Sequence, residues 1–549
     1  MKKTLLFSAM MLAAGITGTA LAQEPVDAAM NAKLREEGLK HSKVMEIAFN
    51  LTDVSGPRLA GSPGLKRAQD WAVKELTSWG LVNAKREPWG KFGKGWEVQK
   101  NYAAITVPYY HAIIAIPKAW TPGTNGPIKG EVVIIKADTI TDLAKYKGKL
   151  KGKVVMMAAA APLNETNFTP NASRFTDSAL LAMANGAGRG GGRRAAGGPP
   201  QGAPGAPAGA PGTPGAAARR GGAGGRGGFG GAGALALRAA IAKMEMDEGA
   251  ALVLSQARGT DGTVFTTNGA SYRDTAHAVL PELETSSEDF QRILRLVNAG
   301  QKVEMEADIK TQFYTDDLQG YNVVAEIPGT DPKLKDQLVM IGGHLDSWHG
   351  ATGGTDNAAG SAVMMEAMRI LKAVGYKPKR TLRIALWSSE EEGEFGSENY
   401  VKNHFADPTD MKQKPEYSKV SAYYNLDNGT GKIRGIYLQG DSAARPIFQA
   451  WLNPFKDLGA ATVTIGNTGS TDHVPFDAVG IPGFQYIQDT MDYNARTHHS
   501  NQDTYDKLSE EDLKQAATIV ASFVYHTSER PEMIPRKPVP APVPPRPGR

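Results

Sequence analysis

The chain has 549 residues, no cysteine and a formal net charge of +5. Without cysteine, disulfides and thiolate metal ligands are excluded, so any transition-metal site must use His, Asp and Glu. Six arginines of a Gly/Pro/Ala-rich tract (residues 186–233, the Gly/Arg tract) and two lysines near the start carry eight positive charges, which leaves −3 for the rest. A folded part that is nearly neutral or slightly acidic gives no electrostatic case for a nucleic-acid partner.

The first residues have the pattern of an export signal. Two lysines precede the apolar stretch LLFSAMMLAAGITG, and the small-residue sequence ALA follows at positions 20–22. We therefore predict a signal peptide over residues 1–22 that is removed after Ala22, which makes the mature protein periplasmic or extracellular. The apolar stretch is short and no second stretch of membrane-spanning length follows, so we expect no stable membrane anchor after cleavage.

The remaining chain divides into parts of different composition. Residues 23–125 and 300–530 alternate helical and strand-like patterns, as expected for one discontinuous α/β domain. Residues 126–299 carry short strands such as EVVIIKAD and GAALVLSQ around the Gly/Arg tract, which cannot bury enough apolar surface to fold. We predict a β-rich insert with this tract as a disordered loop, and an unfolded Pro-rich tail over residues 531–549.

One segment, GGHLDSWHGATGGTDNAAG (residues 342–360), places His344, Asp346 and Asp356 behind the apolar run QLVMI, which predicts a buried strand. Glycines around the polar residues allow the backbone to turn sharply and to approach a ligand. A helix with apolar residues at a 3.6-residue period is predicted from near Asn357. The segment is thus predicted to form a strand, a polar loop and a helix. Because open α/β sheets bind ligands where a strand ends, this loop is a candidate binding site. His and Asp in such a loop indicate a candidate metal site.

Further polar residues follow other predicted strands. Glu390 and Glu391 come after TLRIALWS, Asp427 ends YYNLD, and His498 and His499 lie in a polar loop after PGFQYIQD. Each of them alone is more typical of a solvated face, a turn or a structural histidine. Together, in this order and all at strand ends or in polar loops, they indicate one site.

Such a set suits a pair of divalent cations. Two cations about 3.5 Å apart repel each other and need a carboxylate between them, and each also takes a further carboxylate and an imidazole. Nitrogen and oxygen ligands of this kind favour zinc. The metal pair lowers the pKa of a shared water and polarises a substrate carbonyl, and a glutamate close to that water can deliver its proton to the leaving amine.

These motifs resemble the co-catalytic zinc peptidases, which include the bacterial leucyl-type aminopeptidases and the glutamate carboxypeptidases. The resemblance rests on HxD with GGTDNAAG, on SEEEGEFGS, on NLD and on HHS. It implies a three-layer αβα domain with a mixed sheet, two Zn²⁺ ions, and roles carried over position by position. The general base is then Glu390; one zinc has His344 and Asp427, the other has Glu391 and His499, Asp356 bridges both, and Asp346 orients the imidazole of His344.

Other segments extend the resemblance. GPIKGEVVIIKAD and YKGKLKGKVVMM are similar to a protease-associated domain, which many members carry as an insert, so residues 126–299 are identified with it. STDHVPFDAVGIPGF resembles a substrate-side loop, which makes Thr471 and Asp472 substrate-binding candidates. His498 stands where some relatives have a tyrosine that stabilises the oxyanion, so either His498 or another donor takes that role. The plasma glutamate carboxypeptidase branch is the most similar.

The resemblance implies an exported exopeptidase that hydrolyses short peptides or dipeptides, with an aminopeptidase slightly favoured over a carboxypeptidase or dipeptidase. A second hypothesis, a binding homologue without catalysis, is disfavoured because all ligand positions and Glu390 are present. A third, RNA binding by the Gly/Arg tract, is disfavoured by the export signal and by its single aromatic residue, Phe229. We expect a peptide substrate and no nucleic acid; homodimerisation, side-chain preference and the native metal stay open.

Overall fold

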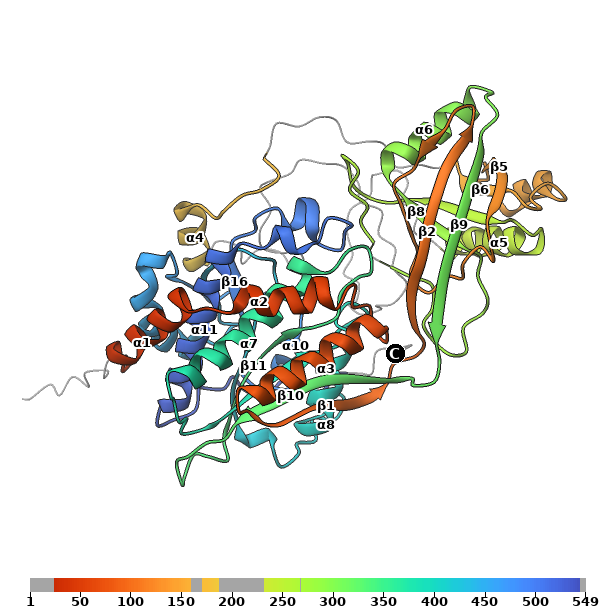
Figure 1. The fold of residues 1–549 in the computed structure, drawn as a ribbon. Helices are drawn as coiled ribbons and strands as arrows, with labels where there is room; N and C mark the ends of the chain where they lie inside the picture. The colour runs from red at the N-terminus through yellow and green to blue at the C-terminus, as the bar shows by residue number, and fades with distance from the viewer. Residues whose placement is uncertain (1–23, 159–169, 187–231, 267, 544–549) are drawn as a thin grey trace, which may run out of the picture.

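The computed structural model describes residues 24–158, 170–186, 232–266 and 268–543. The predicted signal peptide and nearly all of the Gly/Arg tract lie outside these residues. The described chain forms two sheets, each of eight strands, in two bodies that stand side by side (Figure 1). Within it, no helix has both the length and the apolar character needed to cross a membrane.

The first sheet forms the larger body, at the left and centre of Figure 1. It is mixed: β11 is parallel to both β12 and β13, and β13 is parallel to β16, whereas β10 is antiparallel to β12 and β1 to β10. In sheet order its strands are β1 (Val82–Lys91), β10 (Gln319–Ile327), β12 (Thr381–Trp387), β11 (Leu338–His344), β13 (Val420–Asn425), β16 (Gly483–Gln488), β14 (Ile433–Tyr437) and β15 (Thr462–Thr464).

Helices cover both faces of this sheet because its central strands are apolar on both sides. Along β11, Val339 and Ile341 pack with one set of helices, and Leu338 and Met340 pack with another. Alternation of side chains along a strand produces this division. The first face has α1 (Ala28–Lys40), α2 (Val44–Phe49), α3 (Pro63–Ser78), α7 (Ala359–Ala373), α9 (Arg445–Leu452) and α11 (Glu510–Glu529); the second has α8 (Phe395–His404) and α10 (Val474–Ala478). The predicted α/β fold with a mixed sheet is confirmed.

The second sheet forms a smaller body, upright at the right of Figure 1. Its strands extend beyond both ends of the predicted insert (residues 126–299), because the long antiparallel pair β2 and β9 belongs to it. In sheet order they are β3 (His111–Ala112), β2 (Gly95–Val107), β9 (Glu304–Tyr314), β5 (Ile128–Ile135), β6 (Val154–Met157), β7 (Leu252–Gln256), β8 (Glu282–Thr285) and β4 (Ala115–Pro117), with α5 (Ala232–Asp247) and α6 (Ser287–Asn298). A β-rich second body is present; its identity with a protease-associated domain stays a prediction.

One stretch of the predicted insert lies on the first body instead. In residues 170–186, α4 (Asp177–Ala184) packs against β15. Just before it, Arg174 forms ion pairs with Asp489 at 3.0 Å and with Asp512 at 2.7 Å. Because one arginine satisfies two carboxylates there, this stretch is tied to the first body by charge as well as by packing.

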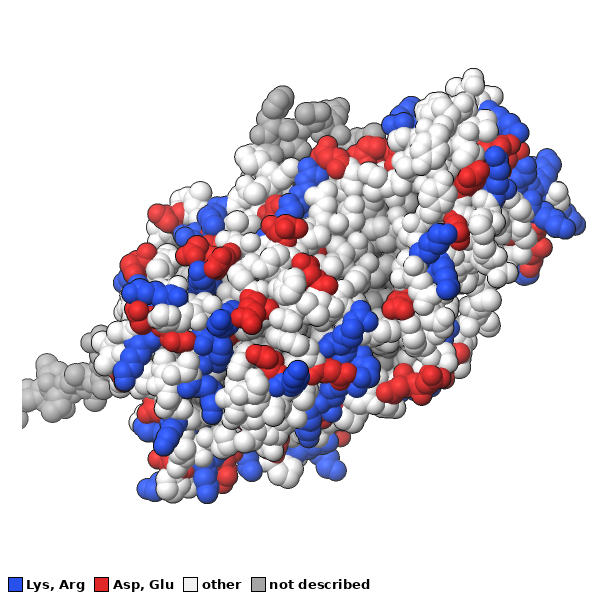
Figure 2. Space-filling view, viewed as in Figure 1, with Lys and Arg blue, Asp and Glu red and all other residues white. Residues whose placement is uncertain are grey.

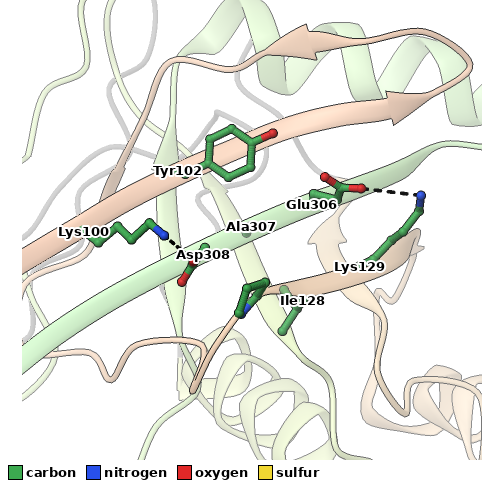
Figure 3. Close-up of a pocket in the computed structure, with 8 residues that line it drawn as sticks. Lys100, Tyr102, Ile128, Lys129, Glu306, Ala307 and Asp308 are labelled. Carbon is green, nitrogen blue, oxygen red and sulfur yellow. Dashed lines mark hydrogen bonds and ion pairs between the residues drawn. The ribbon is translucent and has the colours of Figure 1, made fainter.

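Charged side chains on the surface are interspersed rather than gathered. On the face shown in Figure 2, Lys and Arg alternate with Asp and Glu over both bodies. A hollow over β2, β5 and β9 likewise carries equal numbers of positive and negative side chains (Figure 3). In it Lys100 forms an ion pair with Asp308, and Lys129 forms one with Glu306 at 3.5 Å. The residues that line this hollow include none of the predicted site residues.

The end of the chain differs from the sequence expectation. We predicted an unfolded tail over residues 531–549, but residues 531–543 run along the first body. The backbone N–H of Ile534 donates to Ser421 Oγ at 3.2 Å, and Lys537 forms an ion pair with the same body. A Pro-rich segment cannot join a sheet ladder, yet its extended backbone can dock through the amides and side chains between its prolines.

Candidate metal centre

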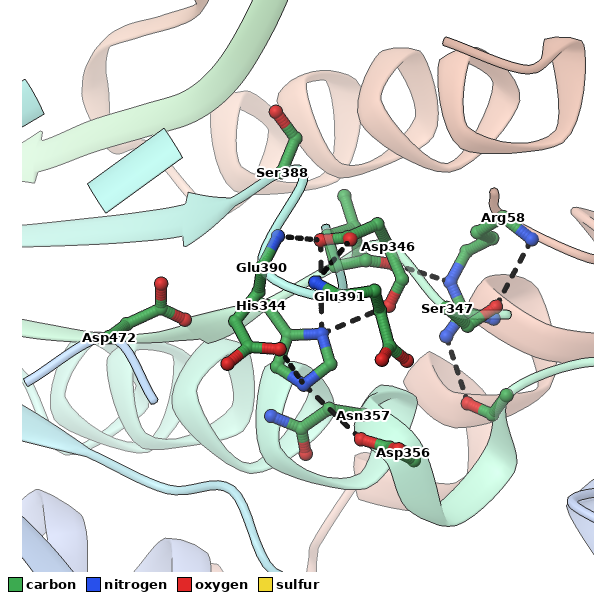
Figure 4. Close-up of polar contacts among 12 residues, drawn as sticks. Arg58, His344, Asp346, Ser347, Asp356, Asn357, Ser388, Glu390, Glu391 and Asp472 are labelled. Atoms are coloured by element: carbon green, nitrogen blue, oxygen red, sulfur yellow. Dashed lines mark hydrogen bonds and ion pairs between the residues drawn. The ribbon is translucent and has the colours of Figure 1, made fainter. Parts of the chain in front are cut away.

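The predicted ligands and the predicted base lie together after the ends of neighbouring strands, and Figure 4 labels His344, Asp356, Glu390 and Glu391 among them. His344 is the last residue of β11, Glu390 and Glu391 follow β12, Asp427 follows β13, and His499 lies in the loop after β16. The chain leaves β11 for α7 on one face of the sheet and leaves β12 for α8 on the other. Open α/β sheets bind ligands where neighbouring strands diverge in this way, at the carboxyl ends of the strands.

Asp356 lies at the centre of the cluster and turns one oxygen to each side. Its Oδ1 is 3.3 Å from His344 Nε2, and its Oδ2 is 3.1 Å from His499 Nε2. The residue belongs to the turn Gly354–Ala358, which leads into α7. A carboxylate placed between two imidazoles in this way can bridge two cations through its two oxygens.

Each imidazole has a second carboxylate beside it. His344 Nε2 is 3.3 Å from Asp427 Oδ1, and His499 Nε2 is 2.8 Å from Glu391 Oε2. The structure thus brings all five predicted ligands together in two groups, each with an imidazole and a carboxylate, that share Asp356. This division provides one ligand set for each of two metal ions.

Unsatisfied polar atoms at the centre show that these residues fit a metal pair. Four buried atoms have no hydrogen bond within the described residues, because the contacts between the imidazoles and carboxylates are close without being hydrogen bonds; these atoms are His344 Nε2, Asp356 Oδ2, Glu391 Oε1 and Asp427 Oδ1. A buried polar atom without a partner costs about 1–3 kcal/mol, so four such atoms in one cluster need a common partner. Imidazole nitrogen and carboxylate oxygen are ligands that zinc accepts. The donor set therefore fits two zinc ions.

The electrostatics favour positive charge at this place. Burial lowers the pKa of His344, but Asp427 and Glu390 raise it well above its ordinary value. Burial likewise lowers the pKa of His499, but Glu391 outweighs it and the pKa rises to about 10. Because the neighbouring carboxylates hold a positive charge on each imidazole so firmly, the cluster as a whole attracts cations.

Glu390 lies at the edge of the cluster. Its Oε2 is 3.9 Å from His344 Nε2, and its side chain is 12 % exposed, whereas that of His344 is fully buried. Burial raises the pKa of Glu390 well above its ordinary value, His344 opposes the shift, and Asp427 and Asp472 add to it. A carboxyl group with a raised pKa beside an activated water can take up a proton and release it.

The segment that carries all of these residues matches a known family model, which covers residues 322–524. The matching model is that of peptidase family M28, so residues 322–524 (the M28 segment) are similar to that family. The five ligand positions and Glu390 all lie inside it.

Relatives extend the similarity beyond the M28 segment. Carboxypeptidase Q from Mus musculus is 30% identical over 260 residues, 47% of this chain and 52% of the relative, so the chain spans about half the length of the curated relatives it matches. A crystal structure of a peptidase M28 precursor from Shewanella amazonensis has a TM-score of 0.61 at 24% identity, over 93% of this chain and 98% of that one. A zinc aminopeptidase from Bacillus subtilis has a TM-score of 0.52 at 18% identity, over 88% and 93%. The fold of both bodies is therefore shared with solved structures.

Asp346 supports the M28 site differently from the sequence expectation. We expected its carboxylate to orient the imidazole of His344, but that carboxylate is 3.8 Å from Nδ1, and the backbone carbonyl of Asp346 is closer, at 3.1 Å. The carboxylate accepts hydrogen bonds from the backbone N–H groups of Glu390 and Glu391, each at 3.3 Å. Asp346 therefore fixes the end of β12 relative to the end of β11, in addition to orienting His344.

Asp503, which the sequence did not single out, supports Asp356, the predicted bridging residue. Its Oδ1 accepts hydrogen bonds from Thr355 N at 2.6 Å and from Thr355 Oγ1 at 2.8 Å, and its Oδ2 accepts one from Asp356 N at 3.1 Å. A buried carboxylate that accepts three bonds from one turn fixes the position of the ligand on that turn. An Asp in the polar run SNQD gave no signal in the sequence, because such residues are typical of turns.

Arg58 is a second supporting residue that the sequence did not single out. Its buried guanidinium donates to the carbonyl oxygens of Leu345 at 2.6 Å, Thr352 at 2.5 Å and Gly353 at 2.8 Å. All three carbonyls belong to the segment that joins His344 to Asp356. Burial lowers its pKa to about 10, with Asp503 opposing, so the group stays charged at neutral pH. Arg58 lies in the Gly- and Pro-rich segment SGPRLAGSPG, whose composition is typical of turns and gave no sign of a supporting role.

Of the predicted substrate-side residues, His498 is the one beside the cluster. Its side chain is 35% exposed, and its Nε2 is 3.8 Å from Asp356 Oδ2. Burial lowers the pKa of His498 to about 4, with His499 adding to the shift, so the imidazole is neutral at neutral pH. A neutral imidazole keeps one N–H donor that can face a substrate oxygen.

Thr471 and Asp472 are placed differently, because both are buried and already hydrogen-bonded. Thr471 Oγ1 accepts a hydrogen bond from Asn425 Nδ2 at 2.9 Å, and Asp472 Oδ1 accepts one from Ser397 Oγ at 2.6 Å. Neither side chain lines an open pocket in this structure. Burial raises the pKa of Asp472 well above its ordinary value, and Asp472 in turn contributes to the raised pKa of Glu390.

Proposed function

We propose that this protein is an exported two-zinc exopeptidase that hydrolyses short peptides or dipeptides, with Glu390 as the general base. One observation carries the proposal: Asp356 turns one oxygen to His344 and the other to His499, and each of these imidazoles has its own further carboxylate. The M28 segment supports peptide hydrolysis, and its relatives include a carboxypeptidase and a zinc aminopeptidase.

The roles of the side chains follow from their positions. Two zinc ions in these ligand groups would lower the pKa of a shared water and polarise the carbonyl of the scissile bond. Glu390 takes the proton of the attacking water and returns it to the leaving nitrogen. His498 donates its N–H to the carbonyl oxygen as negative charge develops there. Asp346 and Asp503 hold the glutamates and the bridging aspartate through their backbone amides.

Glu390→Gln tests the general base. In hydrolysis of a panel of free dipeptides with added zinc, with and without chelator, we expect kcat to fall by about 10²–10⁴-fold. Zinc content stays at two per chain, because Glu390 is outside both ligand groups. Glu36→Gln, an exposed position on α1, is the matched control and keeps the wild-type rate. Full activity of the Glu390→Gln protein overturns the mechanism, whereas a wild-type protein that binds two zinc ions and cleaves nothing supports a binding homologue.

The export part of the proposal rests on the first residues of the sequence. In a bacterial host, we expect the exported protein to begin at Gln23, as determined by N-terminal sequencing of the periplasmic or culture fraction. A version that starts at Gln23 is the control and stays in the cytoplasm. Uncleaved chain recovered with the membranes would contradict the predicted loss of the anchor.

A further inference from the structure

A loop of the second body lies directly against the metal-ligand loop of the first. Within residues 257–266, Phe265 forms an antiparallel bridge with Arg258 on one side and with Ser500 on the other. Next to this bridge, Thr266 N donates to the carbonyl oxygen of His499 at 2.7 Å. The second body therefore supplies one wall beside the imidazole of a predicted ligand.

Arg258 is the cation that this wall presents. Its side chain is exposed, and its guanidinium carbon lies 4.5 Å from the centroid of the Phe265 ring. Among the described residues it has no carboxylate partner, whereas nearby Arg496 forms an ion pair with Asp261 at 2.7 Å. A guanidinium stacked on an aromatic ring is held in place while the N–H donors at its edge stay free.

The register places Arg258 near the loop that carries His498 and His499. Paired residues of antiparallel strands point to the same face and lie about 5 Å apart, so Arg258 is about 10 Å from Ser500 across two pairings. His498 and His499 immediately precede Ser500 in the chain. Arg258 therefore belongs to the segment of the second body that is paired, through Phe265, with the loop of the two imidazoles.

The chemistry of an unpaired guanidinium selects a carboxylate. Arginine binds carboxylates through two parallel N–H···O bonds. In a peptide each residue spans at most about 3.6 Å, so a free α-carboxylate one or two residues beyond the scissile bond lies up to about 7 Å from it, a distance comparable with the spacing of the paired segments. A free amino group would instead need an accessible acid, and the unpartnered oxygens of Glu392 beside the cluster are buried.

We propose that Arg258 binds the α-carboxylate of the substrate, so that the enzyme cleaves dipeptides and other short peptides from their carboxyl end. This inference rests on the proposed peptidase function and names its substrate class. Arg258 is a substrate-binding residue here, and Phe265 is the residue that positions it.

The test compares a dipeptide with its C-terminal amide in the zinc-loaded full-length protein. We expect Arg258→Ala to lower the ratio of kcat/KM for the free acid to that for the amide by about 10- to 100-fold, mainly through KM. Arg258→Lys should recover part of the ratio, because charge remains but the paired geometry is lost. Arg295→Ala, which removes an exposed arginine of α6, keeps the wild-type ratio.

A second readout separates this inference from the proposed function. Binding of the free-acid dipeptide and of its amide is measured by calorimetry in the Glu390→Gln background, where turnover does not interfere. Loss of affinity for the acid alone on Arg258→Ala supports the inference, even if no peptide in the panel is hydrolysed. Equal effects on acid and amide, or no effect on either, overturn it while leaving metal-dependent hydrolysis intact.

Discussion

The sharpest test of the site architecture is Asp503→Asn, because this side chain contacts neither proposed metal position and yet holds the bridging ligand. Its two oxygens accept three hydrogen bonds, two from Thr355 and one from the backbone N–H of Asp356. An amide retains one oxygen and presents an NH₂ group in place of the other. In either orientation at least one buried donor loses its acceptor.

The magnitude follows from that loss. A buried donor left without an acceptor costs about 1–3 kcal/mol, so the free energy of unfolding of the metal-free protein should fall by about that amount. Removal of a residue that supports a metal ligand typically weakens metal binding by about 10- to 100-fold, and we expect a loss in this range for Asp503→Asn. Activity should recover in part at high zinc, since Glu390 and all five ligands remain.

The assay is zinc competition against a chelator of known affinity, with chemical denaturation of the metal-free protein alongside it. Asp506→Asn is the matched control, because Asp506 lies three residues further on and is exposed. Wild-type zinc affinity in Asp503→Asn would refute the reasoning that hydrogen bonds to this turn position the bridging carboxylate. A large loss of stability with unchanged zinc affinity would refute it as well.

Two further predictions concern pH and stability. Burial lowers the pKa of His404, but Glu416 at 3.5 Å and Glu87 at 2.6 Å raise it to about 9. The contribution of the protonated His404 to stability is therefore complete below about pH 6.5 and is lost as the pH rises through 9. In chemical denaturation, His404→Gln should lower the free energy of unfolding by about 1–2 kcal/mol at pH 6 and by almost nothing at pH 10. An equal loss at both pH values contradicts this prediction. Burial raises the pKa of Glu284, whose Oε2 has no hydrogen-bond partner among the described residues, to about 8. The charged form of Glu284 therefore destabilises the fold increasingly as the pH rises from about 4.5 to 8. Glu284→Gln should raise the free energy of unfolding by about 1–3 kcal/mol at pH 9 but not at pH 4.5. No gain at pH 9 would show that water solvates the charge.

The sequence was most informative where a pattern is local. The apolar run before His344 predicts β11, and the glycines after it predict the loop that carries Asp356, because period and turn chemistry act over a few residues. Residues 531–543 show where this fails: their proline content predicts an unfolded tail, but docking against the first body is decided by distant partners such as Ser421. The extent of the second sheet was likewise missed, because the pairing of β2 with β9 joins segments about 200 residues apart in the chain.

By itself the sequence determined which side chains can make the centre: two imidazoles and three carboxylates after strand ends, with no cysteine to compete. Only the tertiary structure decided which residues hold these side chains in place and which loop of the second body lies beside them. The roles of Asp503 and of the Asp346 carboxylate depend on backbone amides from other segments, and the position of Arg258 depends on a loop of the second body meeting the ligand loop. Hydrogen bonds and packing of this kind act through space, so residues with ordinary local patterns become essential once the chain has folded.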